Sequence, residues 1–161
     1  MKTILITGAY GGMGYATARL LRDRGYTVFA LDLKTRDAEE NIIPIEADIT
    51  SEKSVKDALD TIRAHTDSLD AIVHFAAFSL VGESVVNPLK YYENNIYGTK
   101  VLLDAMVANE VKKIVFSSTA ATYGEPENIP ILESDRTCPT NPYGETKLAM
   151  EKMFKWTSEA H

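Results

Sequence analysis

Short apolar runs alternate along the chain with segments in which apolar residues recur every three or four positions. The runs predict five buried β-strands, at Lys2–Thr7, Tyr26–Leu33, Ile42–Ala47, Leu69–Ala76 and Ile114–Ser118. The helical spacing predicts helices at Gly12–Arg24, Ser51–His65, Pro88–Asn109 and Pro142–Ala160. Thr50 stands where the N-cap of the second helix is expected, and Pro142 occupies a first turn, as prolines often do.

This alternation of strands and helices predicts an α/β fold with a parallel sheet. Right-handed crossovers favour a doubly wound, Rossmann-like sheet of order 3-2-1-4-5, with helices on both faces. We expect residues 1–161 to form one domain of this kind. The irregular stretch Ala120–Asn141 contains three prolines and is typical of a functional loop rather than a linker.

Composition narrows the class of partner. The 17 Lys and Arg residues against 23 Asp and Glu residues leave a net charge of -6, which makes nucleic acid and anionic membranes poor partners. No apolar run approaches the roughly 20 residues of a membrane-spanning helix. The single cysteine, Cys138, cannot form a disulfide within the chain, so we expect a reducing compartment, the cytoplasm.

A glycine-rich turn joins the first predicted strand to the first helix, as Thr7-Gly8-Ala9-Tyr10-Gly11-Gly12-Met13-Gly14. Glycines permit a tight turn and close approach of a pyrophosphate, which the N–H groups and the dipole of the helix N-terminus attract. The interpretation as a plain structural turn is about equally good for the glycines alone. Their position between strand and helix favours a dinucleotide site formed by Gly8, Gly11, Gly12, Met13 and Gly14.

Acidic residues follow the second and third predicted strands. A carboxylate at Asp32 can accept both ribose hydroxyls of NAD and would repel the 2′-phosphate of NADP. Lys34 and Arg36 follow it and could weaken that preference, although surface charges there need no special role. Asp48 and Ile49 lie where an adenine ring would rest, but Asp48 could equally help to cap the next helix.

Tyr143 and Lys147 stand four residues apart in the last predicted helix, so they share one face. An ammonium beside a phenol favours the tyrosinate, which can exchange a proton while a hydride moves to or from a nicotinamide. The simplest alternative is a solvated helix face. The hydroxyls of Ser117, Ser118 and Thr119 close the fifth strand, where they would either contact a substrate or cap the strand end.

Two further polar residues lie in apolar surroundings. His74 falls within a predicted strand, where a hydrogen-bonded core histidine is the better interpretation than a catalyst. Asn95 lies inside the long predicted helix, although asparagine is a poor helix former. A buried hydrogen-bonding role would explain its presence.

The combination of these motifs resembles the short-chain dehydrogenase/reductase superfamily. From about Phe78 onward, VGESVVNPLKYYENNIYGT, KKIVFSSTAATYGEP and NPYGETKLAMEKM are similar to the UDP-glucose 4-epimerase family, an extended branch of that superfamily. The resemblance implies that Tyr143 is the catalytic acid/base, that Lys147 binds ribose and assists the tyrosine, and that Thr119 holds the catalytic hydroxyl position. It also implies NAD contacts from Phe75, Ala76, Ala77, Asn95 and Ser117, and a UDP-sugar as substrate.

The first 77 or so residues fit the epimerase family less well. The glycines satisfy both the extended pattern, with Gly11, and the classical pattern, with Gly12. The short connection from Asp32 to Ile42 and the long region Thr50–Asp70 also resemble classical members. We therefore consider a chimera, classical-like to about Ala77 and epimerase-like beyond it, alongside a divergent natural member.

Extended members of the superfamily are about twice as long as this chain. The resemblance therefore implies that later strands and the substrate domain are absent, and that the chain alone has little or no turnover. The fifth strand would then be an exposed edge, and we expect a homodimer or larger assembly through this edge or through the helices Pro88–Asn109 and Pro142–Ala160. Two alternatives stay open: a classical oxidoreductase acting on a small alcohol, and a non-enzymatic scaffold.

Overall fold

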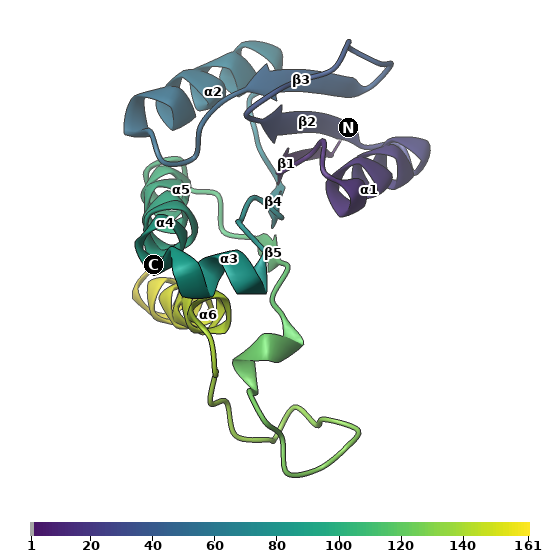
Figure 1. The fold of residues 1–161 in the computed structure, drawn as a ribbon. Helices are drawn as coiled ribbons and strands as arrows, with labels where there is room; N and C mark the ends of the chain where they lie inside the picture. Colours follow the sequence, from purple (N-terminus) through teal and green to yellow (C-terminus); the bar gives the residue numbers. More distant parts are fainter. Residues whose placement is uncertain (1) are drawn as a thin grey trace. The chain divides into compact units, whose positions relative to one another are not determined.

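The computed structural model describes residues 2–161, which form two compact units. One unit contains residues 2–77 and 101–117, and the other contains residues 78–100 and 118–161. We call them the sheet unit and the helical unit. Figure 1 shows the course of the chain through both units.

The sheet unit is built on five parallel strands in the order β3-β2-β1-β4-β5. The strands are β1 (Thr3–Thr7), β2 (Thr27–Asp32), β3 (Ile42–Glu46), β4 (Ala71–His74) and β5 (Ile114–Phe116). The predicted fold class and strand order are confirmed. Strand β4 is two residues shorter than predicted at each end, and β5 ends two residues before the predicted Ser118.

Register places the ends of the central strands side by side. Thr7 at the end of β1 pairs with Leu31 of β2 and with His74 of β4. The residues that follow these strands therefore emerge at one edge of the sheet, its carboxyl edge. Parallel α/β sheets bind their ligands at this edge.

Three helices belong to the sheet unit wholly or in part: α1 (Gly12–Asp23), α2 (Glu52–His65) and α5 (Gly98–Ala108), of which residues from Val101 onward lie in this unit. In Figure 1, α1 lies on one side of the strands and α2 on the other. The N-cap of α2 is Ser51, whose side chain accepts the N–H of Ser54 at 3.2 Å, and not Thr50 as predicted. The serine side chain thus provides a hydrogen-bond acceptor for one of the N–H groups of the first turn that have no partner within the helix.

The core of the sheet unit is formed by apolar side chains of the strands, which point in turn to one face of the sheet and to the other. Ile4, Ile6, Val28 and Ala30 pack with Ala18 of α1 in one buried cluster. Because both faces of the central strands are covered, their sequences are apolar without alternation. This is why the apolar runs predicted the strands well.

The helical unit contains α3 (Val81–Val86), α4 (Pro88–Tyr91), a π-helical segment (Tyr92–Tyr97), a 3₁₀ turn (Ala120–Thr122) and α6 (Pro142–Ala160). Helix α3 was not predicted. The predicted helix Pro88–Asn109 is divided by the π-helical segment, which carries the buried Asn95. Asn87, with φ of −135°, separates α3 from α4, since a residue before proline avoids the helical region.

The stretch between the 3₁₀ turn and α6 is a long loop that returns on itself. Gly124 has φ of +65°, and a Cβ there would lie 1.9 Å from the carbonyl oxygen of Cys138. Only glycine permits this close approach, so Gly124 allows the two ends of the loop to pack against each other. The described residues 2–161 contain no helix that is both long and apolar enough to cross a membrane.

Candidate cofactor and catalytic sites

The glycine turn of the sheet unit is fixed by two of its glycines. Gly8 has φ of +68°, and a Cβ there would lie 2.7 Å from the backbone nitrogen of Ala76. A Cβ on Gly14 would lie 2.1 Å from the carbonyl oxygen of Gly8. Both positions therefore need glycine for the packing of the loop itself, and Gly8 lies against the turn Phe75–Ala77 that follows β4.

The other two glycines are not required by the packing of the protein. A Cβ on Gly12 would meet nothing within 4 Å, and one on Gly11 would make only an ordinary contact of 3.5 Å with the carbonyl oxygen of Gly8. Gly11 is the N-cap of α1 and has no side chain to cap it, and the first turn has no acidic residue. Gly11, Gly12 and Met13 are exposed. This open, uncapped N-terminus of a 12-residue helix fits a pyrophosphate.

Asp32 ends β2 and holds the same loop. Its Oδ2 accepts the backbone N–H of Tyr10 at 2.8 Å, and its Oδ1 accepts the N–H of Leu33 at 2.8 Å. Each carboxylate oxygen retains a second lone-pair direction, so the group can also accept ribose hydroxyls. Asp32 therefore has a structural role that sequence reasoning missed, and its geometry is compatible with the predicted one.

Arg36 lies beside the glycine turn, on the connection between β2 and β3. Its guanidinium carbon is 4.3 Å from the centroid of the Tyr15 ring and 5.6 Å from that of Tyr10. Tyr15 in turn bonds through its hydroxyl to Glu39, which also forms an ion pair with Arg22 at 2.8 Å. Arg36 is thus held by stacking and is more than a loose surface charge.

The remaining predicted residues of the sheet unit follow its strands. Asp48 Oδ1 accepts the N–H of Thr50 at 2.8 Å and its hydroxyl at 2.7 Å in a turn just before α2, whose cap is Ser51, and Ile49 is buried. The N–H of Ser117 bonds to the carbonyl of His74 at 3.2 Å. The adenine role of Asp48 and Ile49 and the cofactor role of Ser117 stay predictions.

His74 is a buried core histidine, as predicted. Its Nδ1 lies 2.6 Å from Oγ1 of Thr7, and its ring stacks on Phe116 with centroids 5.9 Å apart. The hydroxyl of Thr7 also accepts the N–H of Ala76 at 3.4 Å. This pair joins the ends of β1 and β4 just below the glycine turn.

In the helical unit, Tyr143 and Lys147 lie one turn apart on α6. Lys147 Nζ is 6.0 Å from the centroid of the Tyr143 ring. Lys147 is only 3% exposed, and this burial lowers the pKa of its ammonium from 10.5 to about 8. A buried lysine next to a tyrosine is far from the solvated helix face that was the simplest alternative.

Thr119 lies in the same unit as the N-cap of the 3₁₀ turn. Its hydroxyl oxygen accepts the N–H of Ala121 at 3.2 Å, which leaves its hydrogen available to a substrate oxygen. The start of α6 packs on this turn: a Cβ on Gly144 would lie only 2.5 Å from the carbonyl oxygen of Ala121. Gly144 thereby brings Tyr143 close to the turn that carries Thr119.

Asn95 has the buried hydrogen-bonding role that its position suggested. Its side-chain amide accepts the N–H of Phe78 at 2.8 Å and donates to the carbonyl of Phe78 at 3.1 Å. It also donates to the hydroxyl of Thr146 at 3.0 Å, and that hydroxyl donates to the carbonyl of Tyr143 at 2.8 Å. Asn95 thus connects the start of the helical unit to α6.

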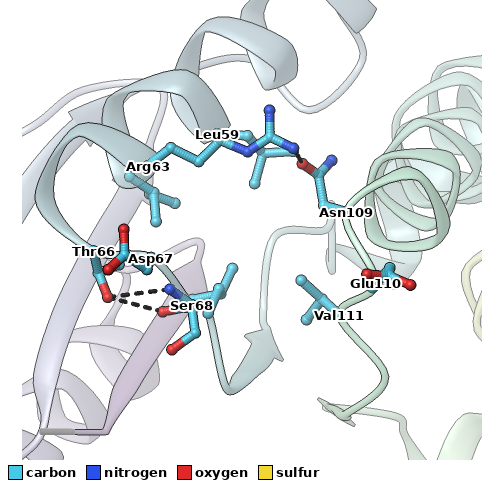
Figure 2. Close-up of a pocket in the computed structure, with 10 residues that line it drawn as sticks. Leu59, Arg63, Thr66, Asp67, Ser68, Asn109, Glu110 and Val111 are labelled. Atoms are coloured by element: carbon cyan, nitrogen blue, oxygen red, sulfur yellow. Dashed lines mark hydrogen bonds between the residues drawn. The ribbon is translucent and has the colours of Figure 1, made fainter.

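A cavity of about 260 Å³ lies elsewhere, in the sheet unit, between the end of α2, the segment before β4 and the end of α5. Figure 2 shows Arg63 reaching Asn109 across it, with Thr66, Asp67 and Ser68 on one side and Glu110 and Val111 on the other. None of the predicted site residues lines it. It adjoins the amino end of β4, whereas the predicted residues follow the carboxyl ends of the strands. Among residues 2–161, no group of three His, Cys, Asp or Glu side chains could hold a metal ion.

Comparison with known proteins places these features in a family. Residues 4–161 match the model of the NAD dependent epimerase/dehydratase family. A UDP-glucose 4-epimerase from Halalkalibacterium halodurans is 53% identical over 161 residues, which are 98% of this chain and 47% of the relative. Both matches cross the boundary near Ala77 at which the sequence pattern changes.

Solved structures agree with the sequence relatives. The structure of the UDP-glucose 4-epimerase from Brucella ovis in complex with NAD has a TM-score of 0.89 and 36% identity, and covers 99% of this chain and 49% of its own. The enzyme from Bifidobacterium longum in complex with NAD⁺ and UDP has a TM-score of 0.87 and 34% identity, with coverage of 99% and 50%. The chain spans about half the length of the relatives that it matches.

Proposed function

The chain belongs to the NAD-dependent epimerase/dehydratase family, and on that premise we propose that it binds NAD and contributes the catalytic residues of a UDP-sugar 4-epimerase. The observation that carries the proposal is Lys147, buried one helical turn from Tyr143 on α6 and 6.0 Å from its ring. A protein that needed this helix only for packing would gain nothing from a buried ammonium, which costs desolvation energy.

The sheet unit supplies the residues that would hold the cofactor. The uncapped N-terminus of α1 at Gly11, Gly12 and Met13 would bind the pyrophosphate, and Asp32 would accept hydrogen bonds from the ribose. A carboxylate fixed by two backbone N–H groups cannot easily turn away from a 2′-phosphate. We therefore propose NAD rather than NADP as the cofactor.

Bound NAD would supply a reversible hydride acceptor for carbon 4 of the sugar. Tyr143, as tyrosinate, would take the proton of the sugar 4-hydroxyl while the hydride leaves carbon 4. Lys147 would stabilise the tyrosinate by its positive charge, and Thr119 would donate a hydrogen bond to the reacting oxygen. Tyr143 would then return the proton to oxygen 4 when the hydride returns to the opposite face of the 4-keto sugar.

Cofactor binding is tested by calorimetric titration of the chain with NAD. We expect Gly12→Asp to lower the affinity at least tenfold, because a carboxylate at this helix end repels the pyrophosphate. Gly82→Asp is the matched control, since Gly82 also stands in a first helical turn with nothing within 4 Å of a Cβ. Failure of the parent chain to bind millimolar NAD would remove the proposal and favour the non-enzymatic scaffold.

Chemistry is tested separately by adding UDP-glucose to the NAD-bound chain and following the absorbance of reduced cofactor. We expect Tyr143→Phe to abolish the absorbance signal, because the phenol oxygen acts on the sugar. Its affinity for NAD should stay within about twofold of the parent chain's. Reduction by a small secondary alcohol in place of UDP-glucose would favour the classical oxidoreductase. The same assay decides whether this chain turns over substrate by itself.

We also propose that the chain pairs with a second copy of itself through the helical unit. Leu89 is 78% exposed, Trp156 on α6 is 63% exposed, and Tyr92 and Tyr97 are also exposed. Apolar residues of this size on α4, the π-helical segment and α6 favour a protein partner over solvent. Sedimentation equilibrium that gives a monomer mass for the parent and for Leu89→Glu would contradict the pairing.

The chimeric origin of the chain stays a hypothesis. Its test is the identity of natural relatives calculated separately for residues 1–77 and 78–161. Equal identity of one relative to both parts would contradict it.

A further inference from the structure

We propose that Ser84 is a positioning residue for Tyr143, whose backbone it anchors to helix α3. The inference rests on the proposed function, in which Tyr143 is the catalytic acid/base. Neither the sequence motifs nor the family resemblance singled out Ser84. A hydrogen-bond chain that lies entirely within the helical unit carries it.

Both hydrogen-bonding capacities of the Ser84 hydroxyl are used. Ser84 is fully buried, and its Oγ donates to the carbonyl of Val81 at 2.7 Å. The same Oγ accepts the backbone N–H of Tyr143 at 3.1 Å. The bond to Val81 aims a lone pair of the oxygen at Tyr143, so the acceptor is oriented before α6 docks on it.

Helix α6 needs such an acceptor because of how it begins. The side chain of its N-cap, Asn141, accepts the N–H of Gly144 at 2.9 Å, and its carbonyl accepts the N–H of Glu145 at 3.0 Å. Pro142 has no N–H. The N–H of Tyr143 is thus an orphan of the first turn that the cap leaves unpaired, and Ser84 satisfies it from another helix.

Helix α3 is itself held firmly, so it can act as an anchor. The hydroxyl of the fully buried Tyr91 lies 2.8 Å from the carbonyl oxygen of Leu80 and 2.8 Å from Glu83 Oε2, and it accepts the N–H of Leu80 at 3.1 Å. Lys90 forms an ion pair with Glu83 at 2.5 Å. The Lys90 ammonium, followed by the Tyr91 hydroxyl, lowers the pKa of Glu83, so this carboxylate stays charged near neutral pH.

This arrangement locates the backbone of Tyr143 from two directions. Asn141 holds the next residue, Gly144, from within the chain, and Ser84 holds Tyr143 from α3. The phenol of Tyr143 extends from a backbone that cannot shift without breaking one of these bonds. Its position relative to Lys147 on the same helix therefore depends on Ser84.

The structural part of the proposal is tested by amide hydrogen exchange of the chain, measured residue by residue with NMR. In Ser84→Ala we expect the Tyr143 amide to exchange roughly tenfold faster relative to that of Gly144, as the loss of one hydrogen bond implies. Ser84→Cys keeps the volume but offers a weaker acceptor, so it should give an intermediate value. Unchanged exchange at Tyr143 in both variants would overturn the proposal.

The functional part uses the reduction of bound NAD by UDP-glucose. We expect Ser84→Ala to slow the reduction at least tenfold while the affinities for NAD and UDP-glucose change less than threefold, and Ser84→Cys to restore part of the rate. Thr3→Val is the matched control, because it removes another buried hydroxyl, which donates to the carbonyl of Ser68 at 2.6 Å. It should lower stability by a similar amount and leave the reduction rate unchanged.

The outcomes separate the inference from the proposed function. Equal rate losses in Ser84→Ala and Thr3→Val would overturn the positioning role, since both would reflect stability alone. If the parent chain binds no NAD, the proposed function fails, and the positioning of a catalytic tyrosine fails with it. Faster exchange at Tyr143 in that case would show that Ser84 is an anchor of the helix only.

Discussion

Lys147 is buried with its Nζ 6.0 Å from the ring centroid of Tyr143, one turn earlier on α6. The two side chains stand on one helix, so their separation is set by the helix and by the backbone contacts at its N-terminus. The protein thus keeps an ammonium out of water beside a phenol.

The first prediction concerns the pH dependence of stability. Burial lowers the pKa of Lys147 from 10.5 to about 8 in the folded chain, so at pH 7 the group is charged in both states and the folded state carries the full desolvation penalty. The penalty is relieved as pH rises from about 8 to 10.5, where only the unfolded chain binds the proton. The lowered pKa of Lys147 corresponds to a destabilisation of the folded chain at pH 7 by roughly 3 kcal/mol, at about 1.36 kcal/mol per pKa unit.

Urea unfolding of the parent and of Lys147→Met from pH 7 to pH 10 measures this effect. We expect the methionine variant to be more stable at pH 7 and the difference to shrink as pH rises. Lys155→Met on the same helix is the control, because Lys155 is exposed and should show a constant difference. Parallel stability curves for the parent and Lys147→Met would contradict the buried ammonium.

Gly144 is predicted to tolerate no side chain. Gly144→Ala would place a Cβ 2.5 Å from the carbonyl oxygen of Ala121, so α6 or the 3₁₀ turn must move, at a cost of roughly 1–3 kcal/mol. Gly82→Ala is the control, because nothing lies within 4 Å of its Cβ and alanine favours a helix. Thermal unfolding should rank Gly82→Ala at or above the parent and Gly144→Ala below it.

Asp32 is predicted to have two separable roles. Asp32→Ala removes the acceptor of the Tyr10 N–H, so it should lower both stability and NAD affinity. Asp32→Asn keeps an acceptor oxygen and should lower stability less, while the loss of charge raises affinity for NADP relative to NAD. Titrations of each variant with both cofactors, beside thermal unfolding, measure the two effects. An unchanged preference for NAD over NADP in Asp32→Asn would exclude the carboxylate as its source.

Asn95 is predicted to be indispensable for the fold of the helical unit. Asn95→Leu would leave the N–H and carbonyl of Phe78 and the hydroxyl of Thr146 with no partner from this side chain, which costs roughly 3 kcal/mol or more in total. Asn128→Leu, in an exposed loop, is the control and should change stability by less than about 0.5 kcal/mol. Chemical denaturation compares the two, and equal losses would show that the buried network contributes little.

Sequence reasoning succeeded where a pattern is local. The apolar runs predicted five strands because buried parallel strands are apolar on both faces, and the crossover rule then gave the strand order. It was less successful in the helical unit. Helix α3 is only 6 residues long, too short for a clear period, and the π-helical segment interrupts the spacing from which the helix Pro88–Asn109 was predicted.

In the candidate site, too, residues in local motifs could be predicted from the sequence and residues that act through distant contacts could not. The glycine pattern, Asp32, Tyr143 and Lys147 could be selected because each role depends on residue type at a fixed spacing. Ser84 could not, because its partner Tyr143 lies 59 positions away. Asp48 was expected either to contact adenine or to help cap the next helix, and the tertiary structure shows that Ser51 caps α2 while Asp48 bonds to Thr50 before it.

The sequence by itself determined the fold class, the strand order, the family and the residue types that carry the chemistry, since these follow from periodicity and from motifs of adjacent residues. The tertiary structure decided which glycines the loop needs for its own packing and which leave room for a ligand. It also decided that Lys147 is buried and that Ser84 holds Tyr143. These properties depend on contacts between distant segments, and no local pattern records how closely two backbones approach.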